Sequence, residues 1–180
     1  DWGFKPGQVI ALGDLISFGL VVSSNDAMQA AASSLGNDAV AQMNAEAAAL
    51  GLTETHFLNP TGLDISQTVA GAYGSAYDVA RMAAMFYKGH PALFSQTTQN
   101  SAVIQTAGSD LTAAATAASL ADVPGFIAGK TGYTDLAGGN LVVVFDVEPG
   151  HPLVAAVLGS SESGRFTDIR TLINAAYHAQ

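Results

Sequence analysis

Apolar residues recur at helical spacing in the first part of the chain. The first set predicts a short buried helix from about residue 11 to residue 21. Its apolar members are Leu12, Leu15, Ile16 and Leu20. Segment 26–50 is rich in alanine and poor in β-branched residues, which favours helix on propensity. Gly36-Asn37-Asp38 interrupts this segment, so we predict two helices, the second with Gly51 as its C-cap.

Two further amphipathic helices are predicted later in the chain. The first covers residues 75–88 and begins with Ser75, which has Asp78 three residues later in the spacing of a capping box. The second begins at about Thr167 and closes the chain. Its apolar positions are Ile169, Leu172, Ile173, Ala176 and Tyr177.

Strands follow a different pattern. Two apolar runs, Leu141–Val147 and Leu153–Leu158, flank a segment with two prolines and a glycine, which predicts a hairpin with a longer loop. Segment 95–123 has little periodicity, and within it we predict one edge strand, Ser101–Thr106. Residues 53–74 lack periodicity and are predicted to form a long loop, a feature that is often functional.

Composition narrows the class of protein. Six Lys and Arg residues against fifteen Asp and Glu residues leave a net charge of −9, which argues against nucleic acid as a partner. The chain has no cysteine, and its four histidines lack metal-ligand spacing, so we expect neither a metal nor a cofactor. We predict a single domain over residues 1–180. Because the first residue is Asp rather than Met, we expect the chain to be processed or a fragment.

Segment 129–138 holds the first candidate for chemistry. Lys130 lies close to two glycines, a sequence that suits a strand approached by another group better than a helix interior. An apolar run follows from Leu141, so we predict Lys130 on or just before a strand, with its ammonium group facing a cleft. A glycine-rich turn with a solvated lysine is the competing interpretation.

Segment 22–27 holds the second candidate. Ser23, Ser24, Asn25 and Asp26 place two hydroxyls, an amide and a carboxylate directly after the first predicted helix. All of these residue types cap helices well, so one interpretation is the N-cap of the alanine-rich helix. The other is a polar cluster that belongs to an active site.

Ser-x-Asn at 23–25 followed by Lys-Thr-Gly at 130–132 resembles motifs of the serine penicillin-recognising enzymes. Other matches extend this resemblance to D-alanyl-D-alanine carboxypeptidases of the low-molecular-weight penicillin-binding protein type, over nearly the whole chain. In chain order the matching segments are 23–27, 43–44, 50–52, 55–63, 75–80 and 130–134.

The resemblance implies an α/β fold of the β-lactamase/transpeptidase-like type, with helices packed on a mainly antiparallel sheet. It implies that Ser23 relays a proton to the leaving amine, that Asn25 holds the substrate amide and that Lys130 supplies positive potential. Thr131, with Gly132 beside it, would bind the terminal carboxylate of the substrate. The backbone N–H of Tyr133 would form half of an oxyanion hole.

The sequence departs from the family pattern in two places. The family takes its nucleophile and base from a Ser-x-x-Lys motif, which is absent here. The residues three positions before the lysines are Trp2, Met85 and Ile127. We therefore expect a domain that is incomplete at the N-terminus and lacks its nucleophile-bearing segment. Segment 111–120 replaces the family's Asn-Thr-Asn-like stretch, which makes substrate contacts from that side doubtful.

Two charged residues outside the motifs are further site candidates. Arg165 follows the last predicted strand, where it is interpreted as solvated in preference to carboxylate-binding. Asp26 is interpreted as a helix cap rather than a base.

The sequence thus predicts a serine-type D-Ala-D-Ala carboxypeptidase that acts through an acyl-enzyme, in the periplasm or another extracytoplasmic part of the bacterial cell envelope. Expected partners are a peptidoglycan stem peptide ending in D-Ala-D-Ala, β-lactams as inhibitors, and the missing N-terminal segment or a companion chain. The alternatives are a D,D-endopeptidase of the same family and a non-catalytic muropeptide-binding module. We expect the chain alone to be inactive.

Overall fold

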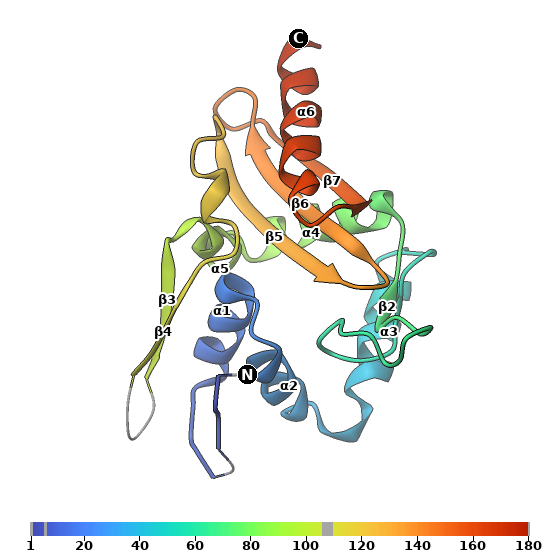
Figure 1. Cartoon of the computed structure of the whole chain (residues 1–180), viewed down its shortest axis with the longest axis vertical. Coiled ribbons are helices and arrows are strands. Elements are labelled where there is room, and N and C mark those ends of the chain that lie inside the picture. Colours follow the sequence, from blue (N-terminus) through green and yellow to red (C-terminus); the bar gives the residue numbers. More distant parts are fainter. Residues whose placement is uncertain (1, 6, 106–109, 180) are drawn as a thin grey trace.

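The computed structural model describes residues 2–5, 7–105 and 110–179. Its central sheet has three antiparallel strands in the order β5-β6-β7. These strands are β5 (Phe126–Thr134), β6 (Gly138–Asp146) and β7 (Pro152–Ser160). Helix α6 (Gly164–His178) lies across one face of this sheet, and α4 (Ala76–Gly89) lies on the other (Figure 1). The predicted α/β class, with helices on an antiparallel sheet, is confirmed.

The side chains of β6 show why helices cover both faces of the sheet. Leu141, Val143 and Phe145 are buried in the core that the sheet shares with α6. Val142 and Val144 are buried in a second core, on the α4 side. Because successive side chains of a strand point to opposite faces, an uninterrupted apolar run is favourable only where both faces are covered.

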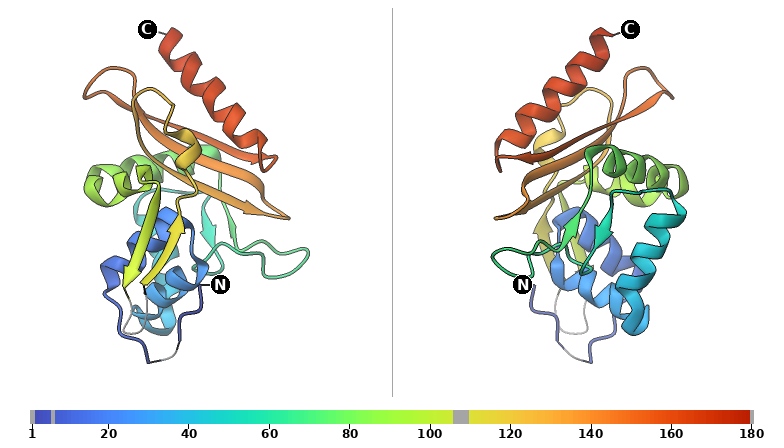
Figure 2. Two further views of the ribbon diagram at one scale, coloured as in Figure 1. Left: turned by 60° about the vertical axis from the view of Figure 1, so that its left-hand side comes forward. Right: turned by 90° about the vertical axis from the view of Figure 1, so that its right-hand side faces the viewer.

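A second group of elements packs beside the sheet and has its own core (Figure 2). Its members are α1 (Leu12–Val22), α2 (Asn25–Ser33), β3 (Ser101–Gln105) and β4 (Asp110–Ala114). Phe18 of α1 is fully buried there, and Trp2 packs edge-on against it at 5.4 Å between ring centroids. This core holds α1 in place, and α1 in turn positions the turn that follows it.

The remaining elements lie between these two groups in the chain. They are the 3-10 turns Gly36–Asp38, Ser95–Thr98 and Ala118–Leu120, the helices α3 (Ala39–Ala49) and α5 (Pro91–Phe94), and the short strands β1 (His56–Phe57) and β2 (Ala72–Tyr73). None of the helices in the described ranges is both long and apolar enough to cross a lipid bilayer.

The predicted helices and the predicted β6–β7 hairpin are confirmed, with bounds that differ by a few residues. Gly51 follows α3 at φ 70°, a conformation that glycine adopts without strain. Two segments hold more structure than the sequence predicted. Segment 53–74 contains the antiparallel β1–β2 pair, and segment 95–123 contains β4 as the partner of β3. Thr106, the predicted end of that edge strand, lies outside the described residues.

The interpretation of Ser75 and Asp78 as a capping box is half correct. Ser75 Oγ accepts a hydrogen bond from Asp78 N at 3.2 Å, which caps α4. The buried Asp78 carboxylate instead accepts from Glu54 N at 2.8 Å and from Thr55 Oγ1 at 3.0 Å. Asp78 therefore ties segment 53–55 to α4, a long-range contact that local spacing does not reveal.

Candidate active site

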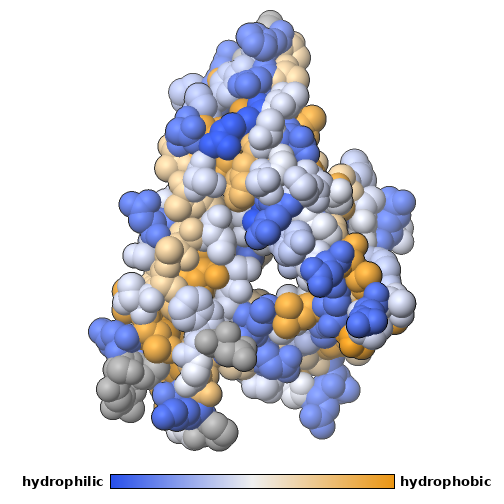
Figure 3. All heavy atoms as spheres, in the orientation of Figure 1, coloured by the Kyte–Doolittle hydropathy of each residue, from blue (hydrophilic) through white to orange (hydrophobic). Residues whose placement is uncertain are grey.

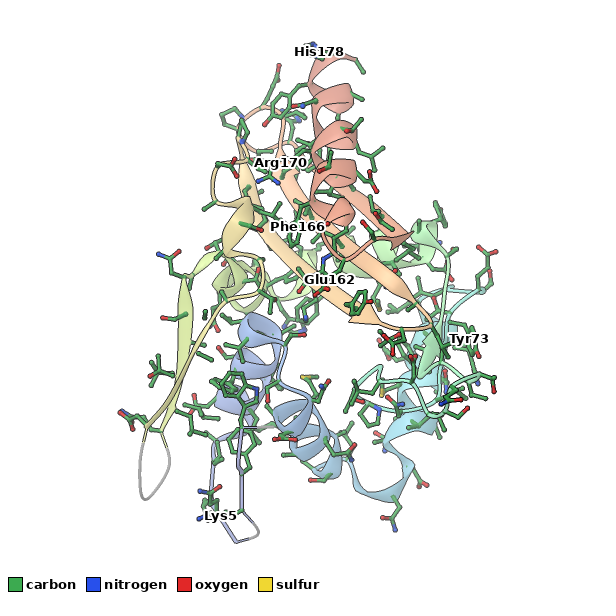
Figure 4. The ribbon with its side chains drawn as sticks, viewed as in Figure 1. Lys5, Tyr73, Glu162, Phe166, Arg170 and His178 are labelled. Carbon is green, nitrogen blue, oxygen red and sulfur yellow. The ribbon has the colours of Figure 1, made fainter. Side chains whose placement is uncertain are left out.

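A cleft of about 830 Å³ lies between the sheet and helices α1 and α2. The molecular surface is visibly hollowed at this place (Figure 3). Its lining includes the turn between α1 and α2, the second half of β5, and the loop of residues 58–71. Tyr73, on β2, lies at its far rim (Figure 4). All six site residues predicted from the sequence line this cleft: Ser23, Asn25, Lys130, Thr131, Gly132 and Tyr133.

Ser23 occupies the turn that ends α1, in an unusual backbone conformation. Its φ of 60° is left-handed, and it is the one non-glycine residue with positive φ in the part of the chain that the structure describes. Such a conformation costs about 1–2 kcal/mol for an L-residue other than glycine. Strained residues of this kind cluster at functional sites. In this conformation Ser23 lines the cleft, where its Oγ accepts a hydrogen bond from Lys130 Nζ at 2.7 Å.

The capping and active-site interpretations of this turn apply to different residues. Ser24 is the N-cap of α2, since its buried Oγ accepts from Ala27 N at 3.1 Å. Asn25 is the first residue of α2 and lines the cleft. The interpretation of Asp26 as a cap is wrong, because its carboxylate accepts from Trp2 N at 2.7 Å and anchors the N-terminal segment.

Lys130 lies in the middle of β5, paired with Val142 of β6. The prediction of a strand lysine that faces a cleft is therefore confirmed, and the solvated-turn interpretation is wrong. Besides Ser23 Oγ, Nζ donates to the backbone oxygen of Thr131 at 2.7 Å. Two acceptors thus hold the amine at one point of the cleft.

The environment of Lys130 lowers its pKa to about 8. Burial, which disfavours the charged form, is the larger cause, and the positive charge of Arg165 is the second. The ammonium form therefore persists at neutral pH, but it loses its proton more readily than a surface lysine does.

The residues after Lys130 lie on the free edge of the sheet. The N–H of Gly129 donates to Thr97 Oγ1 at 3.0 Å, on the edge of β5 that faces away from β6. Because backbone groups alternate between the two edges of a strand, those of Thr131 and Tyr133 face this same edge. Thr131 is buried, whereas the Tyr133 side chain is 48% exposed.

Arg165, at the start of α6, is held in the cleft wall rather than solvated. Its Nη1 donates to the backbone oxygen of Gly132 at 2.7 Å, and its side chain is half-buried. Its Nε is buried and has no hydrogen-bond partner among the described residues. The guanidinium therefore adds a second positive charge beside Lys130, from a position far from the motifs in sequence.

Sequence reasoning missed other residues that line the cleft. Thr116 does so from the segment after β4, where its N–H donates to Val21 O at 3.0 Å. Asn140 does so from β6 and donates to Gly138 O at 2.9 Å. Thr116 depends on a contact between distant segments, and Asn140 reaches the cleft because β6 pairs with β5 at Gly132, so no local pattern marks either residue. The described ranges contain no group of three or more residues that could hold a metal ion.

Solved structures of known proteins share this fold. The fold is that of the β-lactamase-like penicillin-binding proteins. A crystal structure of a D-alanyl-D-alanine carboxypeptidase from Mycobacterium tuberculosis superposes with a TM-score of 0.83 at 30% identity, over 98% of this chain and 67% of that one. Penicillin-binding protein D2 from Listeria monocytogenes, in an ampicillin-bound form, superposes with a TM-score of 0.81 at 26% identity, over 93% of this chain and 67% of that one.

Residues 3–162 match the D-alanyl-D-alanine carboxypeptidase family, and the chain belongs to that family. The protein D-alanyl-D-alanine carboxypeptidase DacB2 of Mycobacterium tuberculosis is 35% identical over 140 residues, which are 75% of this chain. The corresponding protein DacF of Bacillus subtilis is 39% identical over 82 residues, or 44% of this chain. The match spans 46% of the length of the mycobacterial protein and 20% of the length of the Bacillus protein.

Proposed function

We propose that residues 1–180 form most of the catalytic domain of a serine-type D-Ala-D-Ala carboxypeptidase. The reaction would remove the terminal D-Ala of a peptidoglycan stem peptide through an acyl-enzyme. The observation that carries this proposal is the 2.7 Å hydrogen bond from Lys130 Nζ to Ser23 Oγ, which joins two motifs that lie 107 positions apart.

The Ser23–Lys130 pair suits proton transfer to a leaving amine. Ser23 Oγ already accepts a hydrogen bond from Lys130 Nζ, so its own hydroxyl proton is free to point into the cleft. When the amide bond of the substrate breaks, Ser23 would give that proton to the nitrogen of the departing D-Ala. A proton relay of this kind contributes about 10²–10⁴-fold to a rate.

The positive end of the cleft suits a substrate carboxylate. Lys130 and Arg165 place two cations there, and Thr131 offers a hydroxyl beside them. The N–H of Tyr133, on the same free edge of β5, would stabilise the oxyanion at the carbonyl under attack. Asn25, from the opposite wall, would hold the substrate amide.

The nucleophile would come from a segment outside these 180 residues, because no Ser-x-x-Lys motif occurs within them. Two features of the structure offer such a segment a place. The cleft has a volume of about 830 Å³, and the surface is hollowed there (Figure 3). Among the described residues, β6 is the one strand that pairs with β7, so the second edge of β7 is available to a further strand.

The proposed setting is the bacterial cell envelope, outside the cytoplasm, where peptidoglycan is the substrate and β-lactams are inhibitors. A β-lactam presents a strained amide and a carboxylate in the arrangement that this site would recognise. The ampicillin-bound relative from Listeria supports this part of the proposal.

The decisive experiment is intact-mass spectrometry after incubation with benzylpenicillin. We expect a stoichiometric covalent adduct on the protein that carries the serine–lysine segment, and no adduct on the 180-residue chain alone. Likewise, the protein that carries the serine–lysine segment should release D-Ala from a pentapeptide, and the 180-residue chain alone should not. Stoichiometric acylation of the isolated chain, mapped to Ser23, would contradict the assignment of the nucleophile to another segment.

The missing Ser-x-x-Lys motif also favours a second candidate, a non-catalytic module that binds muropeptides. This candidate predicts measurable binding of a D-Ala-D-Ala peptide with neither D-Ala release nor penicillin adduct in any form of the protein. Assays with a pentapeptide and with a crosslinked muropeptide would, in addition, separate a carboxypeptidase from a D,D-endopeptidase.

A further inference from the structure

Loop 58–71, which lines one side of the cleft, is held as a unit by its own hydrogen bonds. The Asn59 side chain accepts from Gly62 N at 2.7 Å and donates to Leu63 O at 2.8 Å. A Cβ atom at position 71 would lie 2.2 Å from Leu63 O, so only glycine fits at this position of the loop. These contacts give the loop a defined shape, but they do not fix its position relative to the sheet.

Asp64 makes the connection to the sheet. Its Oδ1 accepts from Thr134 Oγ1 at 2.9 Å, and its Oδ2 accepts from Leu136 N at 3.2 Å. Thr134 Oγ1 accepts in turn from Ala137 N at 3.0 Å, which also shapes the turn between β5 and β6. In the described ranges, the two bonds of Asp64 are the hydrogen bonds that join loop 58–71 to the β5–β6 turn.

The position of this contact relative to the site gives it a functional consequence. The proposed carboxylate site is at Thr131 and the proposed oxyanion donor is at Tyr133, so a bound substrate runs along β5 toward Thr134. Continued in that direction, the acyl part of the substrate passes between the end of β5 and loop 58–71. Leu63 and Leu136, on the two sides of this gap, both line the cleft.

We propose that Asp64 is a positioning residue that sets the subsite for the acyl part of the substrate. Its carboxylate holds loop 58–71 against the end of β5, and thereby fixes the width of the gap through which that part of the peptide passes. This proposal rests on the proposed function for the direction of the substrate, but the contact itself does not.

The test compares two β-lactams in the protein that carries the nucleophile segment. Benzylpenicillin has an acyl side chain that would occupy this gap, whereas 6-aminopenicillanic acid has none. In Asp64→Ala we expect the acylation rate constant to fall about tenfold or more for benzylpenicillin, since small misplacements of bound groups have large effects on rate. For 6-aminopenicillanic acid we expect a fall of less than about twofold, because its reacting groups do not reach Asp64.

A double-mutant cycle and a matched control complete the design. Thr134→Val removes the hydroxyl that donates to Asp64, so the double variant Asp64→Ala/Thr134→Val should lose little more than either single variant. The control is Asp122→Asn. Asp122 pairs with Arg170 at 2.7 Å, and neither residue lines the cleft, so the loss of this carboxylate should leave both rate constants unchanged.

Hydrogen exchange gives a readout that does not depend on acylation. We expect the amide of Leu136 and the amides of loop 58–71 to exchange faster in Asp64→Ala than in the parent protein. Equal losses of acylation rate for the two β-lactams would overturn the positioning role. Unchanged amide exchange rates would show that Asp64 does not hold the loop against the end of β5. If the parent protein is not acylated at all, the proposed function fails, while the exchange measurement still decides whether Asp64 holds the loop.

Discussion

The two walls of the cleft present polar groups to the same space by different means. On one wall, Lys130 and Thr131 belong to a regular strand whose register with β6 is continuous from Ala128 to Thr134. On the other wall, Ser23 lies between two helices and has a left-handed backbone conformation, with a φ of 60°. The strand wall is positioned by repeated hydrogen bonds, whereas the turn wall depends on a strained residue held by its surroundings.

This difference predicts different responses to substitution. A strand residue can lose its side chain without moving the backbone, because the ladder hydrogen bonds remain. A strained turn residue is held by packing of α1 on one side and by the cap of α2 on the other, so changes there alter stability and geometry together. Four predictions test this contrast, ordered from the largest expected effect to the smallest.

Lys130→Ala should reduce penicillin acylation by about 10²–10³-fold in the protein that carries the nucleophile segment, the usual cost of removing an electrostatic group from a reacting site. The fold should survive, because the lysine contributes charge rather than packing. The measurement is the second-order acylation rate constant together with a circular dichroism spectrum. Unchanged acylation would remove Lys130 from the site.

The free energy of unfolding should depend on pH through Lys130. Its pKa is about 8 in the folded protein and about 10.4 in an unfolded chain, so the unfolded state binds more protons between these values. Stability therefore rises as pH increases from about 8 to about 10, by roughly 3 kcal/mol at most. Denaturant titrations give the free energy of unfolding of the parent protein and of Lys130→Met at each pH, and the difference between the two isolates this contribution. A difference that is flat over the window would show that the amine is not buried.

Ser23→Gly and Ser23→Ala both remove the hydroxyl, so both should lose about 10²-fold in acylation. They should differ in stability, because glycine adopts a left-handed conformation freely and alanine does not. We expect the glycine variant to be more stable than the alanine variant by about 1 kcal/mol in thermal or denaturant unfolding. Equal stabilities would mean that the turn relaxes, and that its strain is not maintained.

Ser24→Ala is the matched control for the neighbouring hydroxyl. Ser24 caps α2 through Ala27 N at 3.1 Å, and losing such a cap costs about 1 kcal/mol of stability. Acylation should change little, because the Ser24 hydroxyl is occupied by the cap. A loss of acylation as large as that of the Ser23 variants would show that the turn acts as one unit.

Much of the site could be predicted from the sequence because its motifs are local. Ser23 and Asn25 lie within three residues of each other, and Lys130 and Thr131 are adjacent, so their residue types are visible without a fold. Arg165 was wrongly interpreted as solvated, since its place beside Lys130 depends on where α6 packs. Asp64 showed no local pattern either, because both of its hydrogen-bond donors lie about 70 residues further along the chain.

The sequence by itself determined the secondary structure where the apolar pattern was strong: helical spacing in α1, α4 and α6, and uninterrupted apolar runs in the β6–β7 hairpin. Apolar spacing indicates which face of a helix or strand must be buried, and this information is contained in the sequence of that element alone. Only the tertiary structure decided that β3 pairs with β4, that Asp78 anchors segment 53–55, and that Asp64 joins the loop to the sheet. These are contacts between residues far apart in the chain, and their free energy depends on a geometry that exists only after the elements have packed.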